Sequence, residues 1–238
     1  MPTSSSNVRL RSRGPGRSAA VLALGATLAL TIAGCSSSST GQSGAPVVIN
    51  GTTTSAGGIR GDELSQPVVL DAAAKNAVFQ STAGGTTTLG ALQKGGLMLL
   101  YFGYTHCPDV CPTTMADIGL ALKKVPAQTQ ARTQVVFVTS DPARDTTSVE
   151  KQWLANFDSG LTRPFVGLTA SLSEIDAVAK SVGVPLSPPV KEPDGSITVE
   201  HGAQTLAFTA DKAHVVWLAG TSQGDYAHDI AALDPGPS

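Results

Sequence analysis

Two cysteines separated by three residues are the part of this chain best suited to chemistry. Cys107 and Cys111 follow an apolar run at 97–102 and precede a segment whose apolar residues recur at near-helical spacing. If Cys111 lies in the first turn of that helix, both sulfurs face the same side, because residues at i and i+4 are neighbours on a helix. Such a pair can close as a disulfide, attack another disulfide or hold a soft metal.

The surroundings of the pair favour chemistry over a structural role. A thiol at a helix N-terminus is favoured as the thiolate by the helix dipole. Pro108 and Pro112 stiffen the loop because their rings fix φ. A disulfide here would close a very small loop and stabilise the fold little. Two thiolates suit Cu(I), an added imidazole suits Cu(II) as well, and a closed zinc site wants a fourth ligand.

Four histidines are candidates for the nitrogen ligand. His106 adjoins Cys107 and is expected to point away from the pair. His214 is expected in a hairpin turn, and His228 on the surface of the last helix. His201 follows a Pro-rich loop and, in a thioredoxin-like order of elements, returns beside the cysteine helix. The residues alone leave this choice open, since a lone histidine is more often a surface or core residue than a ligand.

The elements that position these residues alternate between strand and helix patterns. Continuous apolar runs predict strands buried on both faces at 97–102 and 135–138. Shorter strands are predicted at 67–70, 77–80, 86–89, 165–168, about 198, 205–209 and 215–218. Helices are predicted at 112–124, 146–157, 173–182 and 225–233, with Thr146 or Thr147 and Ser173 as N-caps.

This order predicts an α/β, thioredoxin-like fold with a central mixed sheet flanked by helices and an N-terminal β-hairpin extension. The hairpin turn is expected at Gly84 and Gly85. The cysteines follow a central strand where it turns into a helix. They are therefore expected at the carboxyl end of the sheet, where α/β folds place their sites.

The start of the chain has the pattern of a targeting segment. Four arginines between Arg9 and Arg17 precede an apolar stretch at 19–32, which is too short to span a bilayer comfortably. Residues 32–35 (IAGC) resemble the lipobox of bacterial lipoproteins. We therefore expect a signal peptide at 1–34, a lipidated Cys35, a flexible Ser/Thr-rich linker to residue 58 and one domain at 59–238. The alternative is an ordinary secretory signal with an accidental cysteine.

Charge and cysteine count narrow the function further. Residues 1–34 hold four of the 16 basic residues and none of the 18 acidic ones, which leaves the remaining chain with a formal charge of −6. A mildly acidic domain is a poor candidate for binding nucleic acid. Of the three cysteines, lipidation would use Cys35 and leave a single pair in an oxidising, extracytoplasmic environment.

Two motifs resemble those of a known family. Residues 101–112 (YFGYTHCPDVCP) resemble the signature of the Sco/SenC family of copper chaperones, and residues 138–146 (VTSDPARDT) are similar to its second motif. His201 stands where that family has its distal copper ligand. The family commonly has an acid before this histidine and a serine after it, and here Glu200 and Gly202 occupy those positions.

The resemblance implies a metallochaperone rather than an enzyme. It implies a thioredoxin-like domain that binds copper, as Cu(I) or Cu(II), through Cys107, Cys111 and His201. Such a protein delivers copper to the CuA centre of cytochrome c oxidase or keeps the cysteines of that centre reduced. The implied partners are the oxidase subunit that carries CuA and an extracytoplasmic thiol reductant or copper donor. The implied location is the extracytoplasmic face of the cell membrane, held by the lipid anchor.

Alternatives remain open from the residues themselves. In a thiol–disulfide oxidoreductase, Cys107 would attack, Cys111 would resolve and His201 would be dispensable. A peroxidase would need an arginine and threonine pattern that is not found around Cys107, and a purely structural disulfide is disfavoured by the tiny loop. In the second motif, Asp141, Arg144 and Asp145 either form an ion pair that shapes the site or serve as a turn and a helix cap.

Overall fold

The computed structural model describes residues 58–93, 96–193, 195, 197–234 and 236. The predicted signal peptide, Cys35 and nearly all of the predicted linker lie outside these residues. The strands are β1 Asp62–Val69, β2 Val78–Ser81, β3 Thr86–Thr88, β4 Leu97–Gly103, β5 Thr133–Thr139, β6 Val166–Thr169, β7 Val190–Lys191, β8 Ile197–Thr198, β9 Thr205–Thr209 and β10 Lys212–Trp217. The helices are α1 Ala72–Asn76, α2 Leu89–Leu92, α3 Val110–Leu122, α4 Ala127–Arg132, α5 Thr147–Leu154, α6 Leu172–Ser181 and α7 Gln223–Leu233.

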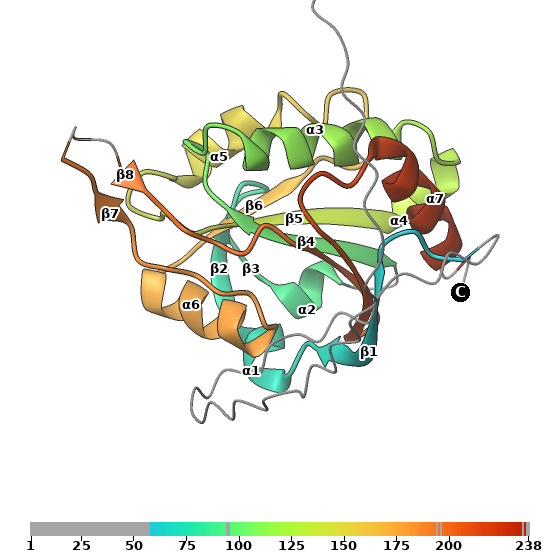
Figure 1. The fold of residues 1–238 in the computed structure, drawn as a ribbon, viewed down its shortest axis with the longest axis horizontal. Helices are drawn as coiled ribbons and strands as arrows, with labels where there is room; N and C mark the ends of the chain where they lie inside the picture. Colours follow the sequence, from blue (N-terminus) through green and yellow to red (C-terminus); the bar gives the residue numbers. More distant parts are fainter. Residues whose placement is uncertain (1–57, 94–95, 194, 196, 235, 237–238) are drawn as a thin grey trace, which may run out of the picture. The chain divides into compact units, whose positions relative to one another are not determined.

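Within the described residues, the strands other than β7 and β8 form one mixed sheet in the order β1-β10-β9-β4-β5-β6-β2-β3 (Figure 1). The strands β4, β5 and β6 are parallel, and the remaining pairings are antiparallel. The expected hairpin is present as β2 and β3, and its turn contains Gly84 and Gly85 at φ +101° and +67°, a region that favours glycine. The predicted α/β, thioredoxin-like fold with a central mixed sheet is confirmed.

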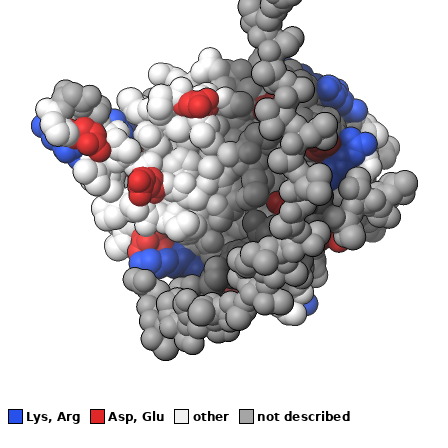
Figure 2. Space-filling model, in the orientation of Figure 1, with Lys and Arg blue, Asp and Glu red and all other residues white. Residues whose placement is uncertain are grey.

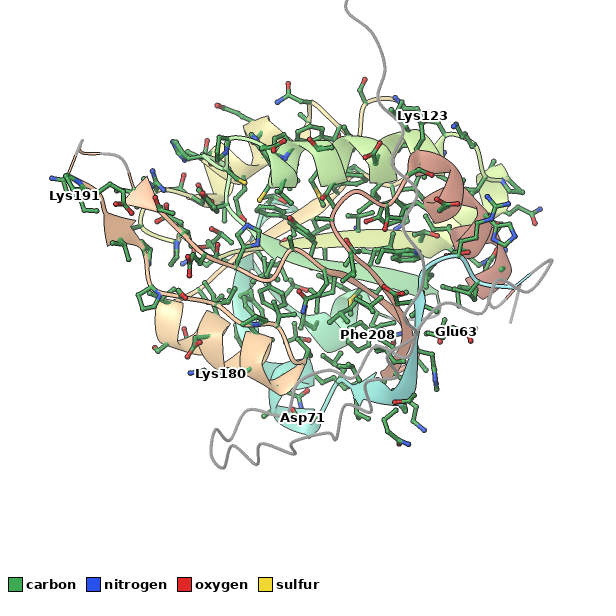
Figure 3. The ribbon with its side chains drawn as sticks, in the orientation of Figure 1. Glu63, Asp71, Lys123, Lys180, Lys191 and Phe208 are labelled. Carbon is green, nitrogen blue, oxygen red and sulfur yellow. The ribbon has the colours of Figure 1, made fainter. Side chains whose placement is uncertain are left out.

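The central strand β4 explains why the fold has two helical layers. All seven of its residues are buried, as the apolar run predicts. Because side chains alternate along a strand, positions 98, 100 and 102 join a core with residues of α1, α2 and α6. Positions 97, 99 and 101 join a second core with residues of α3, α5 and α7. Figure 3 shows Phe208 of β9 among the interior side chains, while Lys123, Lys180 and Lys191 lie at the periphery.

Two sequence-based expectations about local structure were wrong. The helix at 172–181 is capped by Ser171 and not by Ser173, because Ser171 and Glu174 form a reciprocal capping box that only residues three apart can make. His214 is not in the hairpin turn. It lies within β10, and the turn falls at Ala210 and Asp211, between the paired Thr209 and Lys212.

On the face that Figure 2 presents, basic and acidic side chains are scattered among uncharged ones. Of the helices in the described part of the chain, none combines the length and apolarity needed to cross a membrane.

Candidate metal centre

The junction between β4 and α3 places the two cysteines. Cys107 lies in the connecting loop, where its N–H donates to the Tyr104 carbonyl at 3.2 Å. Cys111 is the second residue of α3, and its N–H points at the Cys107 sulfur at 3.5 Å. The sulfur of Cys107 thus sits at the helix N-terminus, as the spacing predicts. Both cysteines are free thiols, with Cys107 half-buried and Cys111 buried.

His201 reaches the same point from ninety residues further along the chain. It forms an isolated β-bridge with Leu186, flanked by hydrogen bonds from the Ser187 N–H to the Glu200 carbonyl and from the Gly202 N–H to the Pro185 carbonyl, both 2.8 Å. These bonds turn the imidazole toward the cysteines. Its Nε2 lies 3.3 Å from the Cys111 sulfur.

Two aromatic rings enclose the imidazole. The rings of Tyr101 and Tyr104 meet it edge-on, with centroids 6.0 and 5.8 Å away. Tyr104 is itself buried. The histidine is therefore confined from two sides.

The three donor atoms fit a single metal ion. The sulfurs of Cys107 and Cys111 and a ring nitrogen of His201 lie within 4.8 Å of one another. Thiolates and imidazoles bind metals such as zinc at about 2.3 and 2.0 Å. The 3.3 Å separation between the Cys111 sulfur and Nε2 is shorter than two such bonds end to end, so one ion can bind both atoms. Two soft sulfurs and one nitrogen suit copper in either oxidation state.

The two thiols differ in acidity. A hydrogen bond from the Cys111 thiol lowers the pKa of Cys107, and contacts with His201 and backbone N–H groups lower it further, against the opposing effect of burial. The pKa of Cys111 is raised, because its proton is shared with the Cys107 sulfur and because it is buried. Cys107 is thus the thiolate of the pair near neutral pH, and the half-buried one.

Tyr101 is a neighbour of the site that the sequence reasoning missed. Its hydroxyl donates to the Cys111 sulfur at 3.6 Å, and burial raises the pKa of this phenol. The approach depends on Gly103, where a Cβ would lie 2.7 Å from the Tyr101 ring and 2.8 Å from the Cys111 sulfur. The alternation of side chains along β4 was the available signal, because it places Tyr101 on the face that α3 covers.

The other residues considered from the sequence lie elsewhere. His106 is exposed and contacts Thr105 and Asp145, so it points away from the thiols as expected. His214 lies on β10, and His228 pairs with Asp229 on α7 at 2.9 Å. In the part of the chain that the structure describes, the one cluster of potential metal ligands is that of Cys107, Cys111 and His201. Cys35 lies outside this part.

Comparison with known proteins agrees with the family resemblance of the motifs at residues 101–112 and 138–146. The family model described as SCO1/SenC matches residues 72–233. A Stutzerimonas stutzeri protein whose name refers to copper binding is 37% identical over 118 residues, which cover 50% of this chain and 55% of that protein. The chain thus spans about half the length of this curated relative.

Solved structures show the same similarity in three dimensions. Copper-bound ScoI of Bradyrhizobium japonicum has 29% identity and a TM-score of 0.55, and the match covers 66% of this chain and 96% of that one. Apo Sco1 of Thermus thermophilus has 28% identity and a TM-score of 0.60, covering 74% and 97%.

Proposed function

Because the chain belongs to the SCO1/SenC family, we propose that it binds copper through Cys107, Cys111 and His201 and passes it on during the assembly of cytochrome c oxidase. The observation that carries this proposal is the convergence of two sulfurs and one imidazole nitrogen within 4.8 Å. Sco proteins are named as cytochrome c oxidase assembly proteins, and copper-bound relatives support the choice of metal.

Each ligand has its own part in carrying the metal. Cys111 holds it from the buried side, while Cys107, as the thiolate, and His201 are both half-buried. A thiolate of the acceptor therefore meets the copper beside these two ligands, and transfer proceeds by exchange of ligands. Loading requires the dithiol, so a disulfide between the cysteines must first receive two electrons and two protons from an external thiol reductant.

The proposal extends to the acceptor and the location. The acceptor is the oxidase subunit that carries CuA, as the motif at residues 101–112 implies. The protein is held at the extracytoplasmic face of the membrane through lipid on Cys35. Mass spectrometry of the mature N-terminus tests this anchor, and an unmodified Cys35 in membrane-extracted protein contradicts it.

The decisive experiment compares His201→Ala with His214→Ala in the reduced protein. His214 is exposed on β10 and does not belong to the cluster, so it is a matched control. Competition against a chromophoric Cu(I) chelator should show an affinity loss of more than about 100-fold for His201→Ala, beyond the 10–100-fold typical of residues that only support a ligand. His214→Ala should bind as the wild type. Equal affinity in all three proteins contradicts the assignment of His201.

A second candidate is thiol–disulfide exchange at the same cysteines. The lowered pKa of the half-buried Cys107, with Cys111 beside it to resolve a mixed disulfide, favours this activity. In this reaction the Cys107 sulfur attacks a substrate disulfide, and the Cys111 sulfur then releases the substrate as a dithiol and closes the intramolecular disulfide. Full exchange activity in a protein that retains no copper favours the second candidate.

A further inference from the structure

We propose that the loop 140–145, called here the bracing loop, is the positioning element of the sulfur–imidazole site, with Asp145 as its principal residue. The bracing loop contains none of the three ligands. It holds Gly103, Tyr104 and Thr105, the three consecutive residues that lead from the end of β4 toward Cys107. This inference rests on the proposed function of the site, and its test includes a readout that does not require copper.

The sheet brings the two loops together. The strands β4 and β5 are parallel and paired to their ends, with Gly103 opposite Thr139, so the loops that follow them emerge side by side. Ser140 secures the first of the three residues, because both its N–H and its hydroxyl donate to the Gly103 carbonyl, at 2.6 and 3.1 Å. The loop that follows β4 and carries Cys107 therefore begins at a backbone position that hydrogen bonds hold in place.

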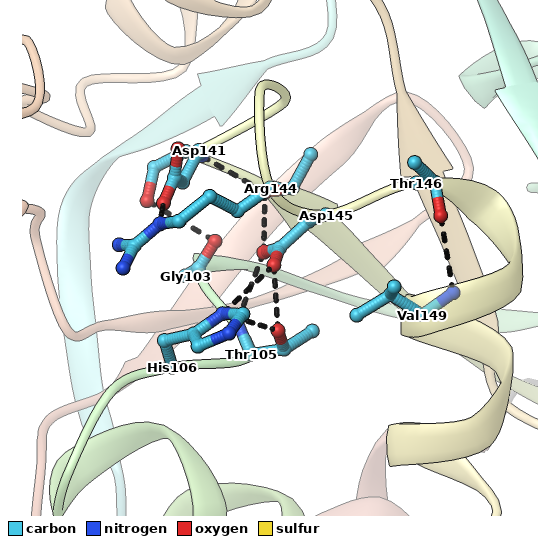
Figure 4. A network of polar contacts seen from close by, with 10 residues as sticks. Gly103, Thr105, His106, Asp141, Arg144, Asp145, Thr146 and Val149 are labelled. Carbon is cyan, nitrogen blue, oxygen red and sulfur yellow. Dashed lines mark hydrogen bonds and ion pairs between the residues drawn. The ribbon is translucent and has the colours of Figure 1, made fainter.

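Asp145 secures the third of the three residues. This fully buried carboxylate accepts hydrogen bonds from the Thr105 N–H at 2.9 Å, the Thr105 hydroxyl at 2.6 Å and the Thr139 hydroxyl at 2.8 Å (Figure 4). Hydrogen bonds to an ionised acceptor are about twice as strong as neutral ones. A helix cap would account for none of these contacts, and Thr146 caps α5 instead.

Arg144 secures the second residue and also reaches the imidazole side. Its Nε donates to the Asp141 carboxylate, which fixes the guanidinium (Figure 4). The guanidinium carbon lies 5.9 Å from the centroid of the Tyr104 ring, within the range of a cation–π contact. The same ring meets His201 edge-on. Arg144 thus acts on the imidazole side of the site through Tyr104, and Asp145 acts on the cysteine side through Thr105.

The consequence for the ligands is direct. Cys107 is two residues beyond Thr105, and its N–H bonds to the carbonyl of Tyr104. A shift of Thr105 therefore moves the Cys107 sulfur relative to Cys111, which α3 holds separately. Supporting groups of this kind orient metal ligands, and their loss typically weakens metal binding about 10–100-fold.

The test compares Asp145→Asn with Asp229→Asn. Asp229 is also fully buried, pairs with His228 and accepts N–H groups from Arg60, Gly61 and the Trp217 indole, but it contacts none of the three ligands. The backbone and indole N–H donors at Asp229 cannot reverse, whereas two of the three donors at Asp145 are threonine hydroxyls, which can, so Asp229→Asn should lose at least as much stability. A site that responds only to stability would suffer at least as much in Asp229→Asn.

Two readouts follow each variant: copper affinity with the thiolate-to-copper absorption band, and the reduction potential of the Cys107–Cys111 couple without copper. Asp145→Asn should lose at least about 10-fold in affinity and shift the band. Its couple should change at least about threefold in equilibrium constant, about 15 mV. Asp229→Asn should leave both readouts unchanged.

Other outcomes are equally decisive. Wild-type readouts in Asp145→Asn, or equal changes in both variants, overturn the inference. If Asp145→Asn does not fold, Thr105→Val removes a single hydroxyl donor and is judged by the same readouts. If the wild type itself binds no copper, the proposed function fails. The reduction potentials of the two variants then decide by themselves whether the bracing loop positions the cysteines.

Discussion

The cysteine side and the histidine side of the site are held by different kinds of structure. The cysteine side is built on β4 and α3, in the centre of the fold, and the bracing loop fixes its approach. The histidine side lies between α6 and β9, beside the small β7–β8 hairpin, which protrudes in Figure 1. Among the described residues, β7 and β8 pair only with each other, and Val190 of β7 is 56% exposed.

Because of this difference, changes on the two sides should affect folding stability and metal binding to different degrees. The sulfurs are positioned by the buried core, so a change there alters folding and the site together. The imidazole is positioned by a bridge to Leu186 and two backbone hydrogen bonds, which contribute little to the core. A change there should affect the site with little effect on folding.

The largest expected effect concerns Glu150 of α5, whose pKa responds to the charge of Asp145 in the bracing loop. Its side chain is fully buried, neither carboxyl oxygen has a hydrogen-bond partner among the described residues, and burial together with the Asp145 charge raises its pKa to about 9. The folded protein thus holds a proton that the unfolded chain releases above pH 4.5. The free energy of unfolding should therefore fall as the pH rises from about 5 to 9, by roughly 3 kcal/mol at pH 7.

Urea unfolding of the wild type and Glu150→Gln at pH 6, 7 and 8 measures this effect. The advantage of the variant should grow by about 1.4 kcal/mol per pH unit. Glu174→Gln is the control. The pKa of Glu174 is lowered by its capping box, so it is ionised in both states over this range and its difference from the wild type should stay constant. A constant difference for Glu150→Gln would show that this carboxyl is ionised in the fold.

The next largest effect is expected when one methyl group is added on the cysteine side. In Gly103→Ala the new Cβ meets the Tyr101 ring, the Cys111 sulfur and, at 3.1 Å, the Phe137 ring. Overpacking a buried site typically costs about 1–3 kcal/mol. We expect a lower urea midpoint and, in the same preparation, weaker copper binding. A variant with wild-type stability would mean that the cysteine side yields more easily than its packing suggests.

The smallest effect is the same change on the histidine side. In Gly202→Ala the new Cβ meets the flexible end of Gln204 at 2.4 Å and the Pro185 ring at 2.9 Å. We expect His201 to shift, with a copper affinity a few-fold lower and an unfolding free energy within about 0.5 kcal/mol of the wild type. A loss of stability as large as that of Gly103→Ala would remove the distinction between the two sides.

Much of the fold followed from local patterns in the sequence. The apolar runs identified β4 and β5, Gly84 and Gly85 identified the hairpin turn, and Thr146 was correctly expected as a cap. The errors arose where two local signals competed. Ser171 and Ser173 both suit a cap, and only the reciprocal bonds with Glu174 distinguish them.

The sequence by itself determined the chemistry: two thiols at i and i+4, at the end of a buried strand and the start of a helix, because strand and helix periodicity are local properties. The tertiary structure decided which of the four histidines joins them. It also decided that Asp145 braces the loop before Cys107 and that Tyr101 contacts the Cys111 sulfur. These contacts join segments from 10 to 90 residues apart, and their geometry depends on strand order and register.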